Sequence, residues 1–190
     1  MTSPASPWDV PDLVGSALRE SLRIGYLDST RSETGRLLAT LAASRTGTIA
    51  DLGTGCGVGA AWLRTGASAV TRVVTVERDP RLARSAARLF AGTGIEVLAG
   101  DWRTMDWAGH DVAGLSLVTL DMETARDARD RLVDLLAPGA LLVLDDPHPW
   151  QDLGTPRDGV ALQGWMHDGR LLCCEVSVAL DAGVLLCTRI

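Results

Sequence analysis

The sequence contains no lysine, and all 18 of its basic side chains are arginines. Aspartate and glutamate together number 24, so the formal net charge is −6 at pH 7. Nucleic-acid binding is driven by clustered cationic side chains. A net negative charge therefore disfavours it. The missing lysine also removes one common catalytic residue. We therefore expect neither a general nucleic-acid binder nor lysine-based chemistry.

Long apolar runs and paired cysteines are also missing. No apolar run approaches the ~20 residues of a membrane span, and residues 1–13 lack the basic and apolar regions of a secretory signal. The cysteines form no C-x-x-C pair, and no histidine lies at zinc-ligand spacing from them; they are Cys56, Cys173, Cys174 and Cys187. We expect a cytoplasmic protein that has no membrane partner and whose cysteines are free thiols.

Strand-like and helix-like segments alternate from Thr48 onward. Nearly continuous apolar strands separated by helices indicate a parallel sheet covered on both faces. The expected strands cover residues 48–52, 72–77, 95–100, 115–121 and 140–146. Three helices are expected between them: one that begins at residue 60, one over 79–90 and one over 123–139. Residues 170–190 predict a hairpin with an Asp-Ala-Gly turn at 181–183, so its strands pair antiparallel.

The N-terminal part has a different pattern. Residues 13–27 and 31–44 both predict helices, and Ser32 is the expected N-cap of the second. We expect one domain, in which a helical segment of residues 1–45 packs on a core of residues 46–190. The predicted fold class is α/β: a Rossmann-like, doubly wound, seven-stranded and mostly parallel sheet with an antiparallel C-terminal hairpin and helices on both faces.

A glycine-rich loop follows the first expected strand, with Gly53, Gly55, Gly57 and Gly59 at every second position. Ligands of such sheets bind at the carboxyl ends of the strands. Glycine lets the backbone turn tightly and lets a ligand approach it, and the next helix offers free N–H groups to an anionic group. These features suit NAD(P) as well as S-adenosylmethionine, because a G-x-G-x-x-A pattern is present and Glu77 lies 20 residues beyond Gly57.

Three further features favour S-adenosylmethionine. Asp51 completes a D-x-G-x-G-x-G pattern that resembles the first motif of class I methyltransferases, and Asp101 in "AGD" resembles their contact to the adenine amino group. The C-terminal hairpin matches the antiparallel last strand of that fold. The resemblance implies that Glu77 accepts from both ribose hydroxyls and that Asp51 orients the amino group. The implied cofactor-binding residues are Asp51, Gly53, Thr54, Gly55, Gly57, Glu77, Arg78, Gly100, Asp101, Trp102 and Asp121.

Each of these residues also has a purely structural interpretation. Glu77 and Asp101 are suited to capping the turns that follow them, and Asp51 is suited to binding loop amides. Trp102 is as well suited to the core as to stacking near adenine. The arginines at helical spacing, Arg78, Arg81, Arg84 and Arg88, are best interpreted as a solvated helix face.

Residues 31–63 are similar to the opening of the cation-dependent catechol and caffeoyl-CoA O-methyltransferase family. In that family a strand-four aspartate and a strand-five Asp-Asn pair bind a divalent cation, usually magnesium. Asp121, Asp145 and Asp146 occupy the matching positions. The resemblance implies an S-adenosylmethionine-dependent O-methyltransferase that acts on a small hydroxylated acceptor, with Mg²⁺ or another divalent cation at these carboxylates. It also implies a homodimer.

Because the sequence departs from the family pattern, the identity of the catalytic base is left open. The family's lysine, three residues after the strand-four aspartate, is Thr124 here, and Asp146 replaces the asparagine. We expect Asp121 and His148 to be catalytic, with His167 as another candidate base. Trp150 and Trp165 form either an aromatic wall for the acceptor or a cover for the sheet edge. The alternatives are a metal-independent methyltransferase with a nitrogen or macromolecular acceptor and a non-catalytic methyltransferase-like binding protein; an NAD-dependent dehydrogenase is disfavoured.

Overall fold

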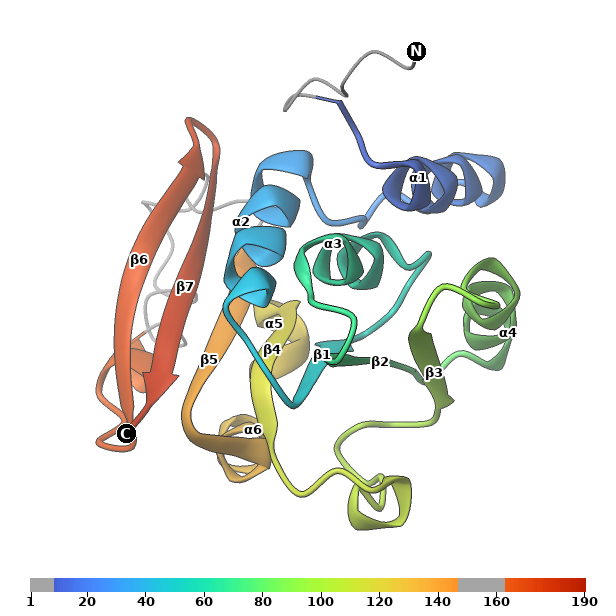
Figure 1. The fold of residues 1–190 in the computed structure, drawn as a ribbon. Coiled ribbons are helices and arrows are strands. Elements are labelled where there is room, and N and C mark those ends of the chain that lie inside the picture. Colours follow the sequence, from blue (N-terminus) through green and yellow to red (C-terminus); the bar gives the residue numbers. More distant parts are fainter. Residues whose placement is uncertain (1–8, 147–162) are drawn as a thin grey trace.

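The computed structural model describes residues 9–146 and 163–190. Within them, a 7-stranded sheet has the strand order β3-β2-β1-β4-β5-β7-β6 (Figure 1). The strands are β1 (Thr48–Leu52), β2 (Arg72–Glu77), β3 (Ile95–Ala99), β4 (Leu115–Asp121), β5 (Leu136–Asp146), β6 (Leu171–Ala179) and β7 (Ala182–Arg189). The first five pair parallel, whereas β7 is antiparallel to both β5 and β6. The predicted fold class is confirmed.

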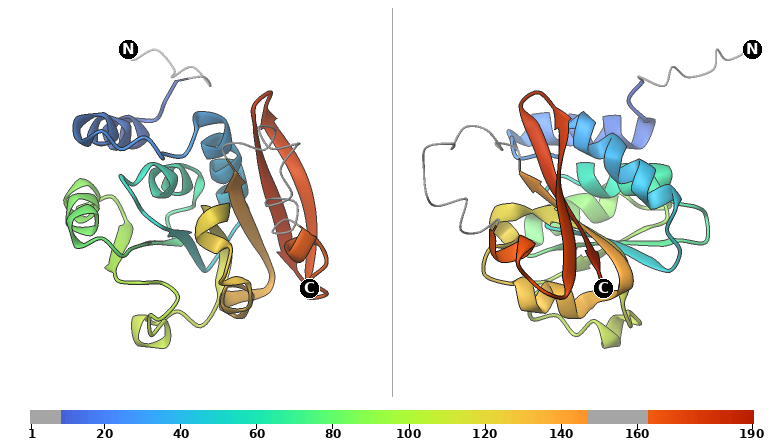
Figure 2. Two further views of the ribbon diagram at one scale, coloured as in Figure 1. Left: turned by 180° about the vertical axis from the view of Figure 1, so that it is seen from behind. Right: turned by 90° about the vertical axis from the view of Figure 1, so that its left-hand side faces the viewer.

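Helices cover both faces of the sheet. One face carries α1 (Asp12–Ile24), α2 (Ser32–Ala43), α3 (Val58–Gly66) and α4 (Pro80–Leu89). The other carries the short helices η1 (Ala108–His110), α5 (Met122–Ala125) and α6 (Arg129–Leu135). In the right-hand view of Figure 2, α1, α2 and α3 lie above the central strands and α6 lies below them, while the hairpin of β6 and β7 crosses in front. Among the described residues, no helix has the length and apolar character required to cross a membrane.

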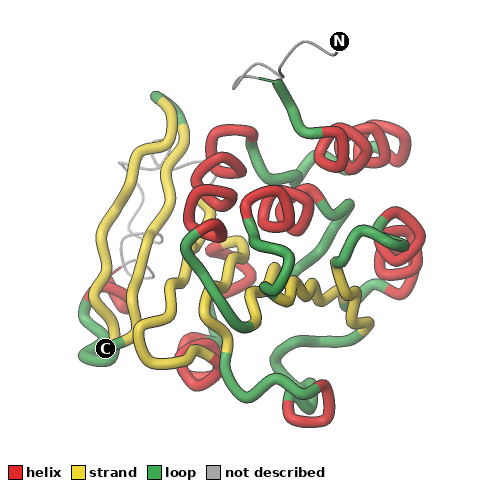
Figure 3. The backbone as a smooth tube through the Cα atoms, viewed as in Figure 1, coloured by secondary structure: helices red, strands yellow, loops and turns green. Residues whose placement is uncertain are grey.

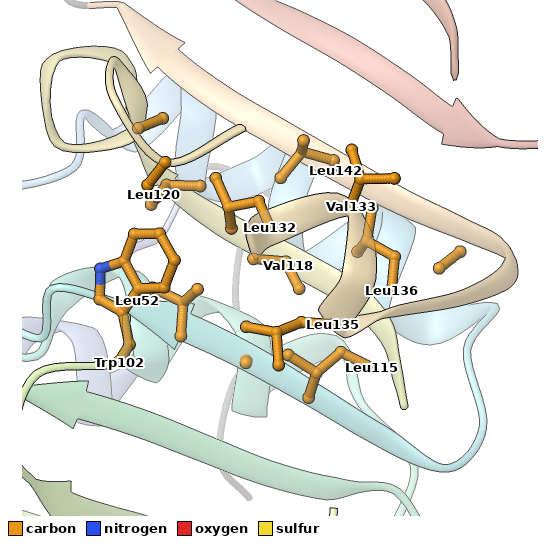
Figure 4. Close-up of a cluster of buried hydrophobic side chains, with 14 of the residues drawn as sticks. Leu52, Trp102, Leu115, Val118, Leu120, Leu132, Val133, Leu135, Leu136 and Leu142 are labelled. Atoms are coloured by element: carbon orange, nitrogen blue, oxygen red, sulfur yellow. The ribbon is translucent and has the colours of Figure 1, made fainter. Parts of the chain in front are cut away.

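Two hydrophobic cores follow from strand geometry, since successive side chains point to opposite faces of a sheet. In β1, Ile49 packs against the N-terminal helices, whereas Ala50 and Leu52 face the other side. Figure 4 shows the second core, in which Leu52 and Leu120 from the strands meet Leu132 from α6. The burial of residues on both faces explains why the central strands, such as β1 and β2, carry apolar residues on both faces.

The order of the strands creates a switch point at the centre of the sheet. From β1 the chain passes outward through β2 to β3 and then returns to β4 on the other side of β1. The tube in Figure 3 shows this return as a long loop that includes η1. Loops therefore diverge from the carboxyl ends of β1 and β4, which is where ligands bind in open α/β sheets.

Several predicted boundaries are wrong. The single helix expected over 123–139 is two helices, α5 and α6, and β5 begins at Leu136. Ala125, Ala128 and Leu132 are buried on both sides of the break, so helical spacing alone gave no sign of it. Ser32 is the first helical residue and not the N-cap, which is Arg31. The hairpin turn is at 180–181, because Ala182 already pairs with Ala179.

The prediction of free thiols is wrong for two of the four cysteines. A disulfide joins Cys173 to Cys187, while Cys56 and Cys174 are free. Cys173 and Cys187 are register partners across β6 and β7, with Cα atoms 4.0 Å apart. The hairpin places them together although their positions are 14 apart in the sequence, a spacing that matches no short cysteine motif.

Candidate functional site

The carboxyl ends of the parallel strands bring most of the predicted site residues to one edge. The amides of Gly53 and Thr54 donate to the Val76 carbonyl at 2.9 and 3.1 Å, which holds the glycine-rich loop against the end of β2. The Gly100 amide donates to the Glu77 carbonyl at 2.9 Å and brings the end of β3 to the same place. On the other side of the switch point, Asp121 and Asp145 are register partners.

Glycine is required at different positions of the loop for different structural reasons. Gly53 has a φ of 108° and nothing within 4 Å of an added Cβ atom, so its face is open to a ligand. Gly55 has a φ of 51°, and an added Cβ atom would lie 2.7 Å from the hydroxyl oxygen of Tyr26. At Gly57 the same space is filled by the Phe90 ring. Only the first of these glycines therefore presents open backbone.

Glu77 is the buried carboxylate at the end of β2, and its residue is 7% exposed. Its Oε2 accepts from the Gly55 amide and its Oε1 from the Asp79 amide, both at 2.8 Å. Each carboxylate oxygen has a second lone pair for a further donor. Two main-chain amides therefore hold a bidentate acceptor in a fixed orientation beside the glycine-rich loop.

Asp51 is buried beneath the same loop. The Thr75 hydroxyl lies 3.3 Å from its Oδ2 and 3.0 Å from its main-chain oxygen. Burial raises the pKa of Asp51 to about 7, and hydrogen bonds from Thr75 and the Ala60 amide only partly oppose this increase. A cation placed beside this carboxyl group would favour its ionised form.

A small pocket lies between the glycine-rich loop and the segment that connects α1 to α2. Residues 25–31 of that segment are called the N-terminal linker below. The pocket is lined by Tyr26, Asp28, Ser29 and Thr30 of the linker and by Asp51, Gly53, Thr54, Cys56, Val58 and Gly59. The linker residues were not predicted from the sequence, because they belong to none of its recognisable motifs. The one available signal was that Tyr26 is the single tyrosine of the chain.

Asp101 lies at the same edge, where it accepts from the Arg103 amide at 3.0 Å and pairs with the Arg103 guanidinium at 3.4 Å. Arg103 also donates to the Thr124 carbonyl at 2.6 Å and lies over the Trp102 ring, 4.8 Å from its centroid. Trp102 is 3% exposed and packs in the core, as one of its two interpretations predicted, and its place near adenine stays a prediction. Arg78 follows Glu77 directly and is exposed to solvent.

The predicted metal-binding carboxylates are only partly brought together. Asp121 is the N-cap of α5, and its Oδ1 accepts from the amides of Glu123 and Thr124 at 2.8 and 3.1 Å. Asp145 accepts from the Thr34 hydroxyl at 3.2 Å. Across residues 9–146 and 163–190, no three histidine, cysteine or acidic side chains form a group that could hold a metal ion. The side chain of Asp146, together with His148 and Trp150, lies outside the described residues.

His167 and Trp165 lie far from this edge. Both immediately precede β6, which begins at Leu171 opposite Arg189 at the end of β7. Because β7 runs antiparallel to β5, the start of β6 lies at the amino ends of the parallel strands. Trp165 is 1% exposed and belongs to the core, and His167 contacts the Gln163 carbonyl. The predictions of His167 as a base and Trp165 as an acceptor wall are therefore wrong.

Known structures resemble the whole arrangement. The O-methyltransferase TomG of Streptomyces achromogenes, solved with S-adenosylmethionine, superposes with a TM-score of 0.76 at 21% identity over 95% of this chain and 91% of that one. An O-methyltransferase of Bacillus cereus in complex with SAH gives 0.72 at 15% identity over 97% and 93%. A methyltransferase of Geobacter sulfurreducens gives 0.73 at 22% identity over 97% and 91%. The chain has the class I methyltransferase fold.

In this fold the glycine-rich loop, Glu77 and Asp101 occupy the ends of the first three parallel strands, as the sequence motifs predicted. No family model matches the sequence, and no curated protein matches it either. At identities of 22% or less the structural similarity establishes the fold alone. The ligand and the reaction therefore depend on the chemistry of the site itself.

Proposed function

We propose that this chain is an S-adenosylmethionine-dependent methyltransferase that methylates a hydroxyl group of a small acceptor. One observation carries the proposal: a buried, pre-oriented carboxylate, Glu77, lies beside the open backbone of Gly53 at the switch point of the sheet. A diol is the natural ligand for two carboxylate oxygens that each have one lone pair left, and a ribose ring supplies one.

The described residues fit such a cofactor. Glu77 would hold the ribose hydroxyls, Asp101 would accept from the adenine amine, and Asp51 would face the ammonium group of the methionine part. S-adenosylmethionine supplies, when bound, an electrophilic methyl group on a sulfonium. The buried Asp51 and the pocket beside it favour a positively charged ligand group. A dinucleotide, whose pyrophosphate is negatively charged, would meet carboxyl groups there.

The acceptor side is formed by the carboxyl ends of β4 and β5. Asp121 is fixed there by the two amides of α5, and we assign it to hold the acceptor hydroxyl. The acceptor oxygen forms a bond to the methyl carbon, the pair of the broken C–S bond stays on sulfur, and the hydroxyl proton leaves to a base or to solvent. Such an in-line displacement depends mainly on positioning. His148 stays a predicted base.

The neighbouring structures support the proposal, since two of the three are O-methyltransferases and two were solved with S-adenosylmethionine or SAH. The predicted Mg²⁺ ligands are Asp121, Asp145 and Asp146, but the described side chains alone do not complete such a site, so no step is assigned to a metal ion. A homodimer also stays a prediction, which light scattering of the purified protein tests.

Calorimetry with S-adenosylhomocysteine and with NAD⁺ tests the proposal. We expect the first ligand to bind and the second not to bind. No binding of S-adenosylhomocysteine would refute the proposed cofactor. Methyl transfer to a panel of small phenols and catechols then tests the reaction, and EDTA followed by Mg²⁺ tests the cation. Cofactor binding without transfer to any acceptor would favour the non-catalytic alternative.

A further inference from the structure

Tyr26 lies directly against the glycine-rich loop. Three atoms of its side chain, Oη, Cε1 and Cζ, would lie 2.7 to 2.9 Å from a Cβ atom added to Gly55. The ring therefore occupies the space that a side chain at Gly55 would fill. Tyr26 is also one of the residues that line the pocket beneath the N-terminal linker. No class I methyltransferase motif of the sequence includes this residue.

The position of Tyr26 is fixed from both sides. The chain leaves α1 through Gly25, whose φ is 70°, and the Tyr26 amide donates to the Ser21 carbonyl at 3.0 Å. The hydroxyls of Ser21 and Ser29 lie 2.7 Å apart and close the linker into a loop. At its far end, Arg31 makes two contacts with the Asp181 carboxylate at 2.9 and 3.0 Å. The ring is thus held over the loop before any ligand binds.

Among the described residues, the surroundings of Tyr26 contain acidic side chains and no basic ones. Asp28 and Asp51 line the same pocket, and no arginine or histidine is among the residues that line it. Burial, followed by the carboxylates of Asp28 and Glu77, raises the pKa of Tyr26 to about 12. The phenol therefore stays neutral at physiological pH and keeps the electron-rich ring face that attracts cations. A ligand group with positive charge fits this pocket best.

We propose that Tyr26 is a specificity-determining residue of the cofactor site, which makes the chain bind the sulfonium donor more tightly than the neutral thioether product. The assignment rests on the proposed function. Methyl transfer removes the positive charge from sulfur, so the attraction between the ring and the sulfonium is lost in the product, whereas the ammonium group assigned to Asp51 is kept. The same residue would therefore favour entry of the donor and departure of S-adenosylhomocysteine.

Calorimetry on four proteins tests this role, with S-adenosylmethionine and S-adenosylhomocysteine as the probes. The proteins are the wild type, Tyr26→Phe, Tyr26→Leu and the neighbouring exposed control Leu27→Ala. We expect Tyr26→Leu to weaken S-adenosylmethionine binding about tenfold more than S-adenosylhomocysteine binding, within the range of a cation–π contact. Tyr26→Phe keeps the ring and should keep most of the preference, and Leu27→Ala should match the wild type.

Equal losses for the two ligands in Tyr26→Leu would overturn the assignment, because a ring that only covers the loop does not distinguish charge. Unchanged affinities for both would overturn it as well. A wild type that binds neither ligand would instead refute the proposed function. If Tyr26→Leu fails to fold, ¹³C labelling of the only tyrosine provides a second measurement on the wild type. Its ring signal should shift more with S-adenosylmethionine than with S-adenosylhomocysteine, and equal or absent shifts contradict the proposal.

Discussion

Asp51 and Glu77 are the two buried carboxyl groups beneath the candidate ligand, and their partners differ. Both oxygens of Glu77 accept from main-chain amides at 2.8 Å. Asp51 has a longer contact of 3.3 Å with the Thr75 hydroxyl, which sits between the main-chain and side-chain oxygens of the same residue. Glu77 therefore serves as a rigid acceptor, whereas Asp51 is a group whose protonation can respond to a ligand.

The stability of the protein should depend on pH through Asp51. Its pKa is about 7 in the folded protein, against 3.8 for the unperturbed group. The folded state keeps a proton that the unfolded state releases, so the free energy of unfolding falls as pH rises from about 4 to about 7. Asp51→Asn has no such titrating group and should not lose stability in this range. In urea unfolding, the free energy of unfolding of the variant relative to the wild type should therefore be higher at pH 8 than at pH 5. An unchanged difference between the two proteins contradicts the burial argument.

Glu77→Gln should lower both the stability of the protein and its affinity for the ligand. An amide group would point an N–H at one of the two main-chain amides that Glu77 now accepts from. We expect a cost of about 1–3 kcal/mol in unfolding free energy, the penalty for an unpaired buried group, and a loss of S-adenosylhomocysteine affinity of at least tenfold. The control is Glu96→Gln, at a half-exposed pair with Arg72, where about 1 kcal/mol or less is expected. Equal effects of the two substitutions would remove Glu77 from the site.

At the level of single residues, the sequence predicted what lies within motifs. Asp51, Glu77 and Asp101 were placed correctly near the carboxyl ends of strands, because each lies within two residues of the end of a largely apolar run. Tyr26 was missed because its partner, Gly55, is 29 residues away and the contact depends on how α1 packs. His167 was placed wrongly because its position depends on the direction of β6, which no local motif relates to the site edge.

Among the elements, α2 and α3 pack against each other at very short distances. An added Cβ atom on Gly35 of α2 would overlap the Trp62 ring of α3, and one on Gly66 would overlap the Ala39 carbonyl. α2 also supplies Thr34, the hydrogen-bond partner of Asp145. The close approach of these helices thus positions the linker and one acidic side chain of the candidate site.

Gly35→Ala should therefore destabilise the protein by about 1–3 kcal/mol, since overpacking forces neighbouring side chains and backbone to move. Gly15→Ala is a matched control, because it adds a methyl group to a helical glycine whose nearest contact is the flexible Arg19 side chain at 3.5 Å. That control should gain up to about 1 kcal/mol from its greater helix propensity. Urea unfolding of both variants measures the difference, and a neutral Gly35→Ala would contradict the close packing of α2 on α3.

Element types were predicted well, and element boundaries less well. Apolar runs identified every strand of the parallel part, because the central strands are buried on both faces and the edge strand β3 still buries Ile95 and Leu98. The break between α5 and α6 was missed because Ala125, Ala128 and Leu132 keep helical spacing through it. The disulfide was missed because the register of the hairpin, and not a local motif, pairs Cys173 with Cys187.

At the scale of the whole molecule, one sheet separates two cores, and the candidate site lies along its carboxyl edge. Residues from the N-terminal linker, β1 and the glycine-rich loop line the pocket, while α1 contributes Val14 and Ala17 to the core shared with α3. The N-terminal helices are therefore part of the same packed unit as the ligand site. We expect unfolding to disrupt the site and the cores together.

A ligand that binds only the folded chain should then stabilise the entire structure. S-adenosylhomocysteine at 100 times its Kd should raise the free energy of unfolding by about 2.7 kcal/mol, or the Tm by about 5–10 °C for a chain of this size. The unfolding curve should remain a single transition, because the pocket joins the N-terminal linker to the central strands. NAD⁺ should leave the Tm unchanged, and Glu77→Gln should reduce the shift at the same ligand concentration. Two separate transitions, of which only one responds to the ligand, would contradict a single unit.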